Sequence, residues 1–388
     1  MIKILLLVTS LSMSLLAQNA QEFQEQQNKS FNTYKKTQEE NFKAYQDSQS
    51  KAFEEYKKEL GVYWEKPKLS TKRTWISYTE DKKTRTNVDF SKNTIILETI
   101  ANSPKQAKEN LQVALAKAVT IDTKTLQDTD PLEKKLAKIT IPDGVADAKV
   151  NAEPILSTVV FKKMPTKKLV YNYVNKNILN KNIKEKESKK VKYHKIYSIK
   201  VDLPNDTMLK RSKLYKDEIF KHARIQKLPA SLVFAIMHSE SSYNPRARSH
   251  IPAFGLMQIV PKTAGIDSYK YLYKKKRLVT GRYLYNSTNN ITMGTAYLHI
   301  LYYRYLKAIK NPESRLYCAI AAYNTGAGNI AWAFTRTYNM KKAAPLINKL
   351  TPSQVYAKLL KDLRWDEPKH YLKKVSKRMS AYNRVYGN

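Results

Sequence analysis

AIMHSESSYNPRARSHIPAFGLMQIVPKTAG, residues 235–265, starts as an apolar run and reaches one glutamate, Glu240, before a segment rich in serine, proline and arginine. Val233, Ile236 and Met237 precede Glu240 by seven, four and three residues, so on a helix they share its face. The carboxyl group therefore continues an apolar stripe, at a helix end where the backbone dipole opposes negative charge. Both effects favour the neutral acid and predict a raised pKa. The alternative is an ordinary solvated glutamate at a helix end.

Neutral hydrogen-bonding side chains follow this glutamate. Ser249 comes after the proline that stops the helix, and the segment FGLMQI brings in Gln258 behind a glycine. Farther on, AAYNTGAGN puts Tyr323 and Asn324 at the end of a second predicted helix, before a flexible turn. Flat apolar faces with neutral polar edges are what a sugar-binding groove needs. Taken singly, each of these residues also fits a purely structural role; Tyr323, for example, also fits the role of a buried aromatic residue of the core.

No second catalytic carboxylate stands near Glu240 in the sequence. Most glycosidases place two carboxylates beside the scissile bond, yet between Glu240 and Asp362 the chain has only Asp267 and Glu313. A lone acid suits a reaction in which the substrate supplies the nucleophile, through an N-acetyl group or an internal hydroxyl. Four other acids remain candidates that the fold could bring in: Asp217, Glu218, Asp366 and Glu367.

The 388 residues carry 70 Lys and Arg against 33 Asp and Glu, a formal net charge of +37. Residues 205–388 hold 33 of these basic residues and 9 of the acidic ones. This excess of positive charge favours electrostatic contact with an anionic wall polymer or membrane surface. Alternatively, the charged side chains form only the solvated surface of a Lys-rich chain. No nucleic-acid partner is expected, because no recognised motif accompanies the charge. We expect no metal and no other cofactor.

The first residues, MIKILLLVTSLSMSLLAQNAQ, have the pattern of a secretory signal peptide at 1–20: a lysine, an apolar core and small residues at its end. The apolar core is too short and serine-interrupted for a membrane span. Gln18 stands where a lipoprotein signal would have its cysteine. We therefore expect an exported, periplasmic protein without a lipid anchor, whose charge leaves membrane association open. The single cysteine, Cys318, cannot form an internal disulfide.

Residues 21–60 contain an eleven-residue repeat, NKSFNTYKKTQ, EENFKAYQDSQ and SKAFEEYKKEL. A period of eleven corresponds to about 3.67 residues per helical turn, which places the repeated aromatics on one helix face. The repeat predicts an amphipathic helix that packs on its own domain or self-associates; a spacer or membrane-surface role is the alternative. The aromatics are Phe31, Phe42, Phe53, Tyr34, Tyr45 and Tyr56.

The remaining chain predicts an α+β protein. In residues 61–204 the runs TWISYT, TNVDF and TIILETI predict strands, with SKN as a hairpin turn, and IYSIKVDLP predicts another strand. Residues 103–138 have a helical pattern, and NKNIKEKESKKVKYHK is charged enough to be exposed or mobile. Residues 205–388 are mainly helical. We expect a smaller mixed α/β domain with a basic linker at 61–204 and a helical domain at 205–388.

Five blocks of the second half are similar in order and spacing to the lysozyme-like domain of the soluble-type lytic transglycosylases. They are ESSYNPRARS, GLMQIVPKTAG, NITMGTAYL, AAYNTGAGN and EPKHYLKKV. The upstream stretch VYWEKPKLSTKRTWISYTEDKKTRTNVDFSKNTIILETI resembles the N-terminal domain of the membrane-bound lytic murein transglycosylases of type C. The resemblance implies a lysozyme-like catalytic domain that acts on the glycan strands of peptidoglycan.

The resemblance also implies roles for residues. Glu240 would protonate the β-1,4 bond between N-acetylmuramic acid and N-acetylglucosamine, then take a proton from the C6 hydroxyl, leaving a 1,6-anhydromuramyl end. Ser249 would help to position the N-acetyl group. The groove would be lined by Gln258, Tyr323, Tyr371, the backbone of Ala322 and position Val260, where the family often has methionine; the residue pattern adds Asn324.

Two alternatives remain at the level of sequence. A hydrolase of the goose-type lysozyme kind would share the fold and the acid, and would differ only in using water as the nucleophile. A wall-binding scaffold with an inactive site would keep the groove without the chemistry. Neither the oligomeric state nor the choice between internal and terminal cleavage follows from the residues.

Overall fold

The computed structural model describes residues 2–161, 164–179, 181–250 and 252–387, with side chains from residue 25 onward except residues 28, 30, 31, 34, 35 and 38. The signal peptide expected at 1–20, and Phe31 and Tyr34 of the repeat, therefore lie outside the described side chains. In the described part of the chain, no helix combines the length and the apolar content that a membrane crossing requires.

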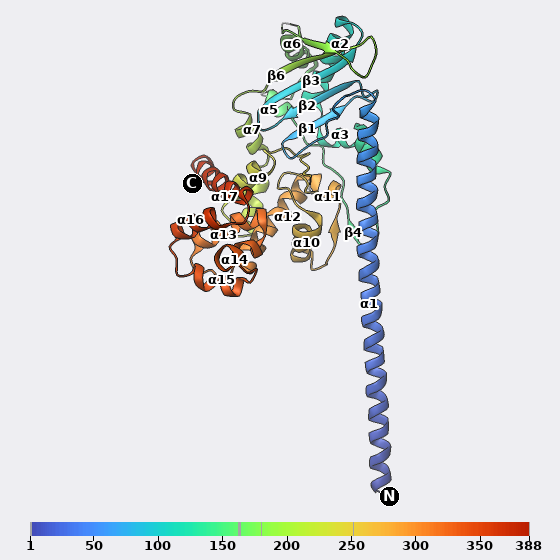
Figure 1. The fold of residues 1–388 in the computed structure, drawn as a ribbon, viewed down its shortest axis with the longest axis vertical. Helices are drawn as coiled ribbons and strands as arrows, with labels where there is room; N and C mark the ends of the chain where they lie inside the picture. The colour runs from blue at the N-terminus through green and yellow to red at the C-terminus, as the bar shows by residue number, and fades with distance from the viewer. Residues whose placement is uncertain (1, 162–163, 180, 251, 388) are drawn as a thin grey trace.

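The first half is built on a five-stranded antiparallel sheet in the order β1-β2-β3-β6-β5. The strands predicted from sequence are confirmed, and the predicted turn joins β2 to β3, where Asp89 accepts hydrogen bonds from the backbone of Ser91 and Lys92. Two helices, α2 and α6, cover one face (Figure 1). The strands are β1 Thr74–Tyr78, β2 Thr84–Asp89, β3 Thr94–Ala101, β5 Lys184–Glu187 and β6 Lys195–Asp202; the helices are α2 Pro104–Thr120 and α6 Lys167–Ile178.

Two local expectations are confirmed, and the structure adds detail to each. The helical pattern of residues 103–138 corresponds to three consecutive helices: α2, α3 Thr123–Thr129 and α4 Pro131–Ala137. The breaks fall at Asp122 and Asp130, whose carboxylates cap the next helix by accepting backbone N–H groups. The charged stretch after residue 180 is exposed, as expected, but part of it is the ordered edge strand β5, whose alternating lysines suit an unpaired sheet edge.

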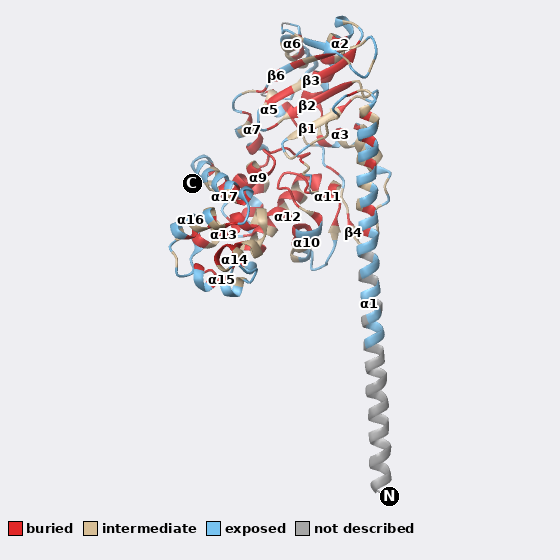
Figure 2. Cartoon of the chain, in the orientation of Figure 1, coloured by how far each residue is buried: buried red, intermediate tan, exposed pale blue. Residues whose placement is uncertain are grey.

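The second half is a helical assembly around α9 Ala230–Glu240, which packs on α17 Asp366–Tyr386. Figure 2 shows buried residues concentrated at α9 and in the sheet. The other elements are α5 Ser157–Val160, α7 Thr207–Leu214, α8 Lys216–Ile225, α10 Ile266–Tyr273, α11 Gly281–Tyr285, α12 Ser287–Ile300, α13 Pro312–Thr325, α14 Ala327–Thr335, α15 Met340–Ile347, α16 Pro352–Asp362 and the π-helical turns Pro261–Gly265 and Leu301–Tyr305.

The expected α+β class, with a sheet-containing first half and a helical second half, is confirmed. The chain between the halves crosses over: β4 Val145–Ala146 pairs in parallel with β7 Leu278–Val279, and Ala146 and Val150 are buried in the core of the helical half. The domain boundary at residue 205 stays a prediction.

A single long helix, α1 Ile2–Gly61, runs along the body and extends past it (Figure 1). Its last turns pack under the sheet, where Tyr56 and Leu60 join a cluster with Trp64 and Tyr78. Phe42 and Tyr45 of the repeat are buried as well. These contacts favour the first interpretation of the repeat, a helix that packs on its own protein.

Candidate active site

Glu240 is the last residue of α9, and the helix that carries it is buried from Leu232 to Met237. Beyond it the chain turns back sharply, with Ser242 and Tyr243 at positive φ. The Ser241 hydroxyl fixes this turn by donating to the Leu256 carbonyl at 2.7 Å. The apolar pattern before Glu240 thus forms the helix, and the polar pattern after it forms the turn that ends the helix.

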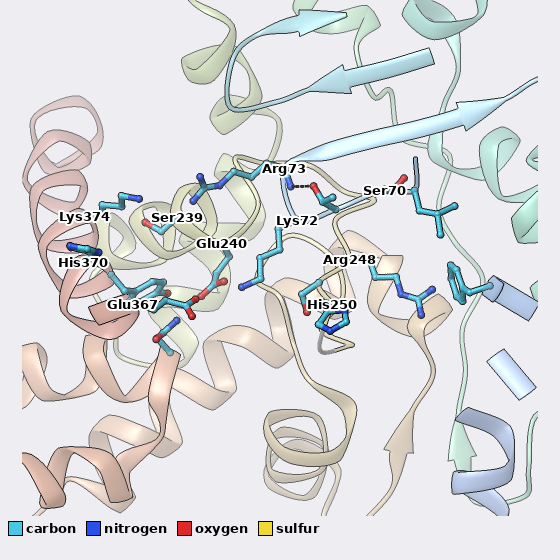
Figure 3. A pocket seen from close by; sticks show the side chains of 16 residues that line it. Ser70, Lys72, Arg73, Ser239, Glu240, Arg248, His250, Glu367, His370 and Lys374 are labelled. Atoms are coloured by element: carbon cyan, nitrogen blue, oxygen red, sulfur yellow. Dashed lines mark hydrogen bonds between the residues drawn. The ribbon is translucent and has the colours of Figure 1, made fainter. Parts of the chain in front are cut away.

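A pocket of about 910 Å³ opens beside Glu240 (Figure 3). Its walls come from α1, the segment before β1, the end of α9, the loop after it, the end of α13 and the first turns of α17. The lining residues are Phe53, Leu69, Ser70, Thr71, Lys72, Arg73, Ser239, Glu240, Arg248, Ser249, His250, Asn324, Glu367, His370, Tyr371 and Lys374. Such a volume is in the range of small-molecule sites. The charged residues of its lining are mainly cations: Lys72, Arg73, Arg248 and Lys374 against Glu240 and Glu367.

The electrostatics of Glu240 favour the protonated form. Its side chain is buried, with 6% of the residue exposed. Burial raises the pKa of its carboxyl group above the ordinary value, and the charge of Glu367 adds to that rise. The cations Lys72 and Arg73 and the Tyr371 hydroxyl oppose it without cancelling it. The raised pKa expected from the apolar helix face is therefore supported by the geometry.

Several residues singled out from the sequence meet at this pocket. Ser249, Asn324 and Tyr371 line it together with Glu240, although they come from three separate elements. Tyr323 lies close behind: its hydroxyl donates to the Met257 carbonyl at 2.8 Å. Burial raises the pKa of the Tyr323 phenol well above its usual value, and the charge of Glu240 contributes to this rise.

Three other residues lie outside the pocket lining. Gln258 is buried and donates through Nε2 to the carbonyls of Ala247 and Gly255, while its Oε1 accepts no hydrogen bond from the described chain. The Ala322 carbonyl accepts from the Gly326 N–H at 2.7 Å, and the Val260 carbonyl accepts from the Gly265 N–H at 2.9 Å. Their contribution to a glycan groove stays a prediction.

The fold also brings in residues that sequence reasoning missed. Lys72 and Arg73 belong to the segment before β1 and reach the pocket from the other half of the chain. His370 and Lys374 come from α17, one helical turn apart. No local pattern marks these residues, because their position depends on how the sheet and the helices pack together.

One of the four acids left open by the sequence reaches the site. Glu367 lines the pocket, and Figure 3 shows its side chain directed at the same region as that of Glu240. The other three lie elsewhere: Asp217 lines a separate cavity, Glu218 bonds to His222 at 3.1 Å, and Asp366 pairs with Lys369 at 3.2 Å. Among the described residues, no group of three or more His, Cys, Asp or Glu gathers to hold a metal ion.

A buried acid with a raised pKa beside a pocket, in a mainly helical fold, defines a candidate site for an enzyme that uses acid–base chemistry. Residues 217–345 match the family model of the Transglycosylase SLT domain. That span includes Glu240 and most of the helical half.

Curated relatives match over most of the chain. Membrane-bound lytic murein transglycosylase C of Klebsiella pneumoniae (strain ATCC 700721 / MGH 78578) is 32% identical over 81% of this chain and 83% of its own length. The protein of the same name from Serratia proteamaculans is 32% identical over 80% of this chain and 83% of its own length. The chain therefore belongs to the membrane-bound lytic murein transglycosylase C family and is a lytic transglycosylase.

Among solved structures, the 70 kDa soluble lytic transglycosylase of Escherichia coli is similar to part of the chain. It has 24% sequence identity and a TM-score of 0.36, and the match covers 47% of this chain and 26% of that chain.

Proposed function

We propose that the protein cleaves the β-1,4 bond between N-acetylmuramic acid and N-acetylglucosamine in peptidoglycan, without water, and leaves a 1,6-anhydromuramyl end. The observation that carries this proposal is the buried Glu240 carboxyl, with its raised pKa, facing a pocket in a chain of this family. An acid whose pKa is raised by burial suits the first step of such a cleavage.

In this proposal Glu240 makes two proton transfers. First, it gives its proton to the glycosidic oxygen; the C1–O bond breaks, and N-acetylglucosamine leaves with a new hydroxyl. The muramyl N-acetyl group stabilises the positive charge at C1. Then the Glu240 carboxylate takes the proton of the C6 hydroxyl as that oxygen bonds to C1, which restores the acid. Lys72 and Arg73, which lower the pKa of Glu240, stabilise the carboxylate between the two steps.

Other pocket residues would hold the sugar. Ser249, whose hydroxyl lies in the loop after α9, would position the N-acetyl group, while Asn324 and Tyr371 line the pocket on the opposite elements. Gln258 lies outside the pocket lining, and the family resemblance alone gives it a part in the groove. The family resemblance extends the groove to Tyr323, the backbone of Ala322 and position Val260.

Hydrolysis is the second candidate, and one observation favours it. Glu367 supplies a second carboxylate to the pocket. Most glycoside hydrolases use a pair of carboxyl groups, one on each side of the bond that they cleave. In that mechanism Glu367 would activate a water molecule, which would attack C1 in place of the C6 hydroxyl.

Mass spectrometry of digested sacculi distinguishes the two. The expected products carry anhydro ends, lighter by one water than reducing ends, and take up no isotope from ¹⁸O-labelled water. Glu367→Gln is the matched variant, expected to keep the anhydro products. Labelled reducing ends as the main product, lost in Glu367→Gln, would establish hydrolysis instead.

We further propose that the enzyme works outside the cytoplasm on peptidoglycan strands, in accordance with the name of its relatives and the expected signal peptide. Fractionation of cells with an antibody to the chain tests this. Recovery in the periplasmic or envelope fraction is expected, and recovery with the cytoplasmic fraction would contradict it.

A further inference from the structure

A second cavity, of about 890 Å³, lies at the start of α9, the end of that helix opposite Glu240. Its walls come from α8, the turn into α9 and the last turn of α17. At 1.5 Å per residue, the 11 residues of α9 put its two ends about 16 Å apart. The two cavities share no lining residue, so this one has no part in the chemistry at Glu240.

The first turn of α9 presents unpaired backbone donors to this cavity. Pro229 precedes the helix and has no N–H of its own, and no side chain caps the helix start. Within the described residues, the N–H groups of Ala230 and Ser231 donate to no acceptor, and both residues line the cavity. The positive end of the helix dipole adds to these donors, and together they favour an anion.

The side chain of Ser231 is a further free donor at the same point. The residue is buried, with 6% exposed, and it lines the cavity. Its hydroxyl makes no hydrogen bond in the part of the chain that the structure describes. Because buried hydroxyl groups ordinarily have a partner, a ligand in the cavity would supply the one that the protein does not.

The charged side chains of the lining are mostly cations. Lys216, Lys221 and Arg224 stand against one carboxylate, that of Asp217. Among the described residues, Lys216 and Arg224 form no ion pair, and Lys221 has only a long one with Glu218, at 3.9 Å. The lining therefore carries an excess of two positive charges, beside a helix start that also favours negative charge.

Apolar groups complete the cavity. The ammonium group of Lys216 lies over the rings of Phe220 and Tyr386, at 5.8 and 6.0 Å from their centres, so the cation is held at an aromatic wall. Two aliphatic side chains that line the same cavity are exposed, Ile225 and Val385. Exposed aliphatic residues beside cations are typical of a surface that contacts lipid headgroups.

We propose that this cavity binds a phosphate group, held by the free donors at the start of α9, including Ser231, and by the cations Lys216 and Arg224. Phosphate has several acceptor oxygens for these donors, and a phosphate monoester carries close to two negative charges at pH 7, which balances the lining. A soluble phosphate and the headgroup of an anionic phospholipid share this chemistry. The inference does not use the chemistry at Glu240, so loss of anhydro products would leave it standing.

The first test is isothermal titration calorimetry of the full chain with inorganic phosphate at constant ionic strength. Wild type is expected to bind phosphate saturably. Arg224→Met should weaken the affinity on the order of tenfold, since it removes a charge-assisted hydrogen bond. Ser231→Ala removes one neutral donor and should weaken the affinity several-fold. Circular dichroism checks that both variants remain folded.

Arg384→Met is the matched control. Arg384 is an exposed cation of α17 between two residues of the cavity lining, Asn383 and Val385, but it does not line the cavity itself. Its substitution should leave the phosphate affinity nearly unchanged. Equal weakening in Arg224→Met and Arg384→Met would show attraction by diffuse charge, and it would overturn the inference. Equal affinity for acetate, or no saturable binding of phosphate, would overturn it as well.

A second experiment separates the two sources of phosphate. The chain is sedimented with phosphatidylcholine vesicles that do or do not contain phosphatidylglycerol. If the site takes a headgroup, vesicles with phosphatidylglycerol should carry the chain down, and free phosphate should release it. Ile225→Ser should then weaken sedimentation and leave the calorimetric affinity for phosphate unchanged. Saturable phosphate binding without sedimentation would support the site and assign it to a soluble phosphate. Sedimentation that Ser231→Ala and Arg224→Met leave unchanged would contradict a headgroup at this cavity.

Discussion

The sheet and the catalytic pocket each bury one glutamate, and the two glutamates behave in opposite ways. Glu98 on β3 is 8% exposed and Glu240 on α9 is 6% exposed. Burial raises the pKa of both. At Glu98, a hydrogen bond from Arg85 at 2.5 Å, the Arg85 charge and Lys68 at 3.6 Å outweigh it and leave the pKa lowered. Glu240 has only more weakly acting cations, and its pKa stays raised.

The difference shows that a closely paired cation, and not the depth of burial, decides the direction in which the pKa of each acid is shifted. Arg85 also stacks over Trp64 at 4.1 Å and donates to the Lys66 carbonyl at 3.1 Å, so the Glu98 pair ties β2 and β3 to the chain after α1. Glu240 forms no such ion pair within the described residues, and its pKa stays raised.

The largest expected effect is on catalysis. Glu240→Gln removes the only group proposed to transfer protons, so the cleavage rate should fall on the order of 10³-fold or more, since general acid–base catalysis contributes about 10²–10⁴. Release of muropeptides from sacculi measures this. Glu98→Gln is the control: the part of the sample that remains folded should keep its specific activity. Full cleavage by Glu240→Gln would favour the scaffold interpretation.

The next effect is on stability. Arg85→Met leaves Glu98 buried without its partner and should lower the free energy of unfolding by about 3 kcal/mol. Urea unfolding followed by circular dichroism measures it. Lys200→Met breaks the exposed pair with Asp202 and should cost about 0.5 kcal/mol or less. An equal loss of unfolding free energy in Arg85→Met and Lys200→Met would mean that the buried Glu98 pair stabilises the fold no more than an exposed ion pair does.

The pH dependence of stability should distinguish the two acids by sign. A carboxyl whose folded pKa is raised destabilises the fold above its unfolded pKa, so Glu240→Gln should be more stable than wild type at neutral pH. That gain should disappear as the pH falls below about 4.3, the value of a free Glu. Glu98, with a lowered pKa, stabilises the fold above that value, so Glu98→Gln should be less stable at neutral pH. The same sign for both would contradict the comparison.

A smaller effect concerns the alkaline limb of the pH–rate profile, where Glu240 loses its proton. Lys72→Met removes a cation that lowers the pKa of Glu240 and should move the limb to higher pH. Glu367→Gln removes a charge that raises it and should move the limb to lower pH. Each shift should be on the order of one pH unit or less. If the two substitutions only disturbed the pocket nonspecifically, the alkaline limb would move in the same direction in Lys72→Met and in Glu367→Gln.

Local patterns predicted what local contacts decide. The helix that ends at Glu240, the four predicted strands β1, β2, β3 and β6, and the β2–β3 turn follow from residues adjacent in sequence. The apolar face of that helix was enough to predict an acid with a raised pKa. Ser249 and Asn324 could be placed at the site because Ser249 follows the end of α9 and Asn324 lies in the last turn of α13.

What depends on packing between distant segments could not be predicted. Lys72 lies before a strand of the other half, and nothing near it in sequence indicates that it faces Glu240. Glu367 was one of four candidates for a second acid near Glu240. Only the position of α17 in the fold shows that it lines the pocket. The repeat predicted a packed helix, but the contact of Phe53 with Arg248 required the arrangement of α1 against the loop after α9.

The protonation state of Glu240 is central to the proposed mechanism, and an infrared titration measures it directly. The protonated-carboxyl band of wild type minus that of Glu240→Gln should isolate one group. We expect that group to keep its proton well above the ordinary pKa of glutamate, about 4.3, and to lose it over the same range in which activity falls. A difference band that disappears at or below that ordinary value would show a solvated or paired carboxylate, and would contradict the role of Glu240 as the acid.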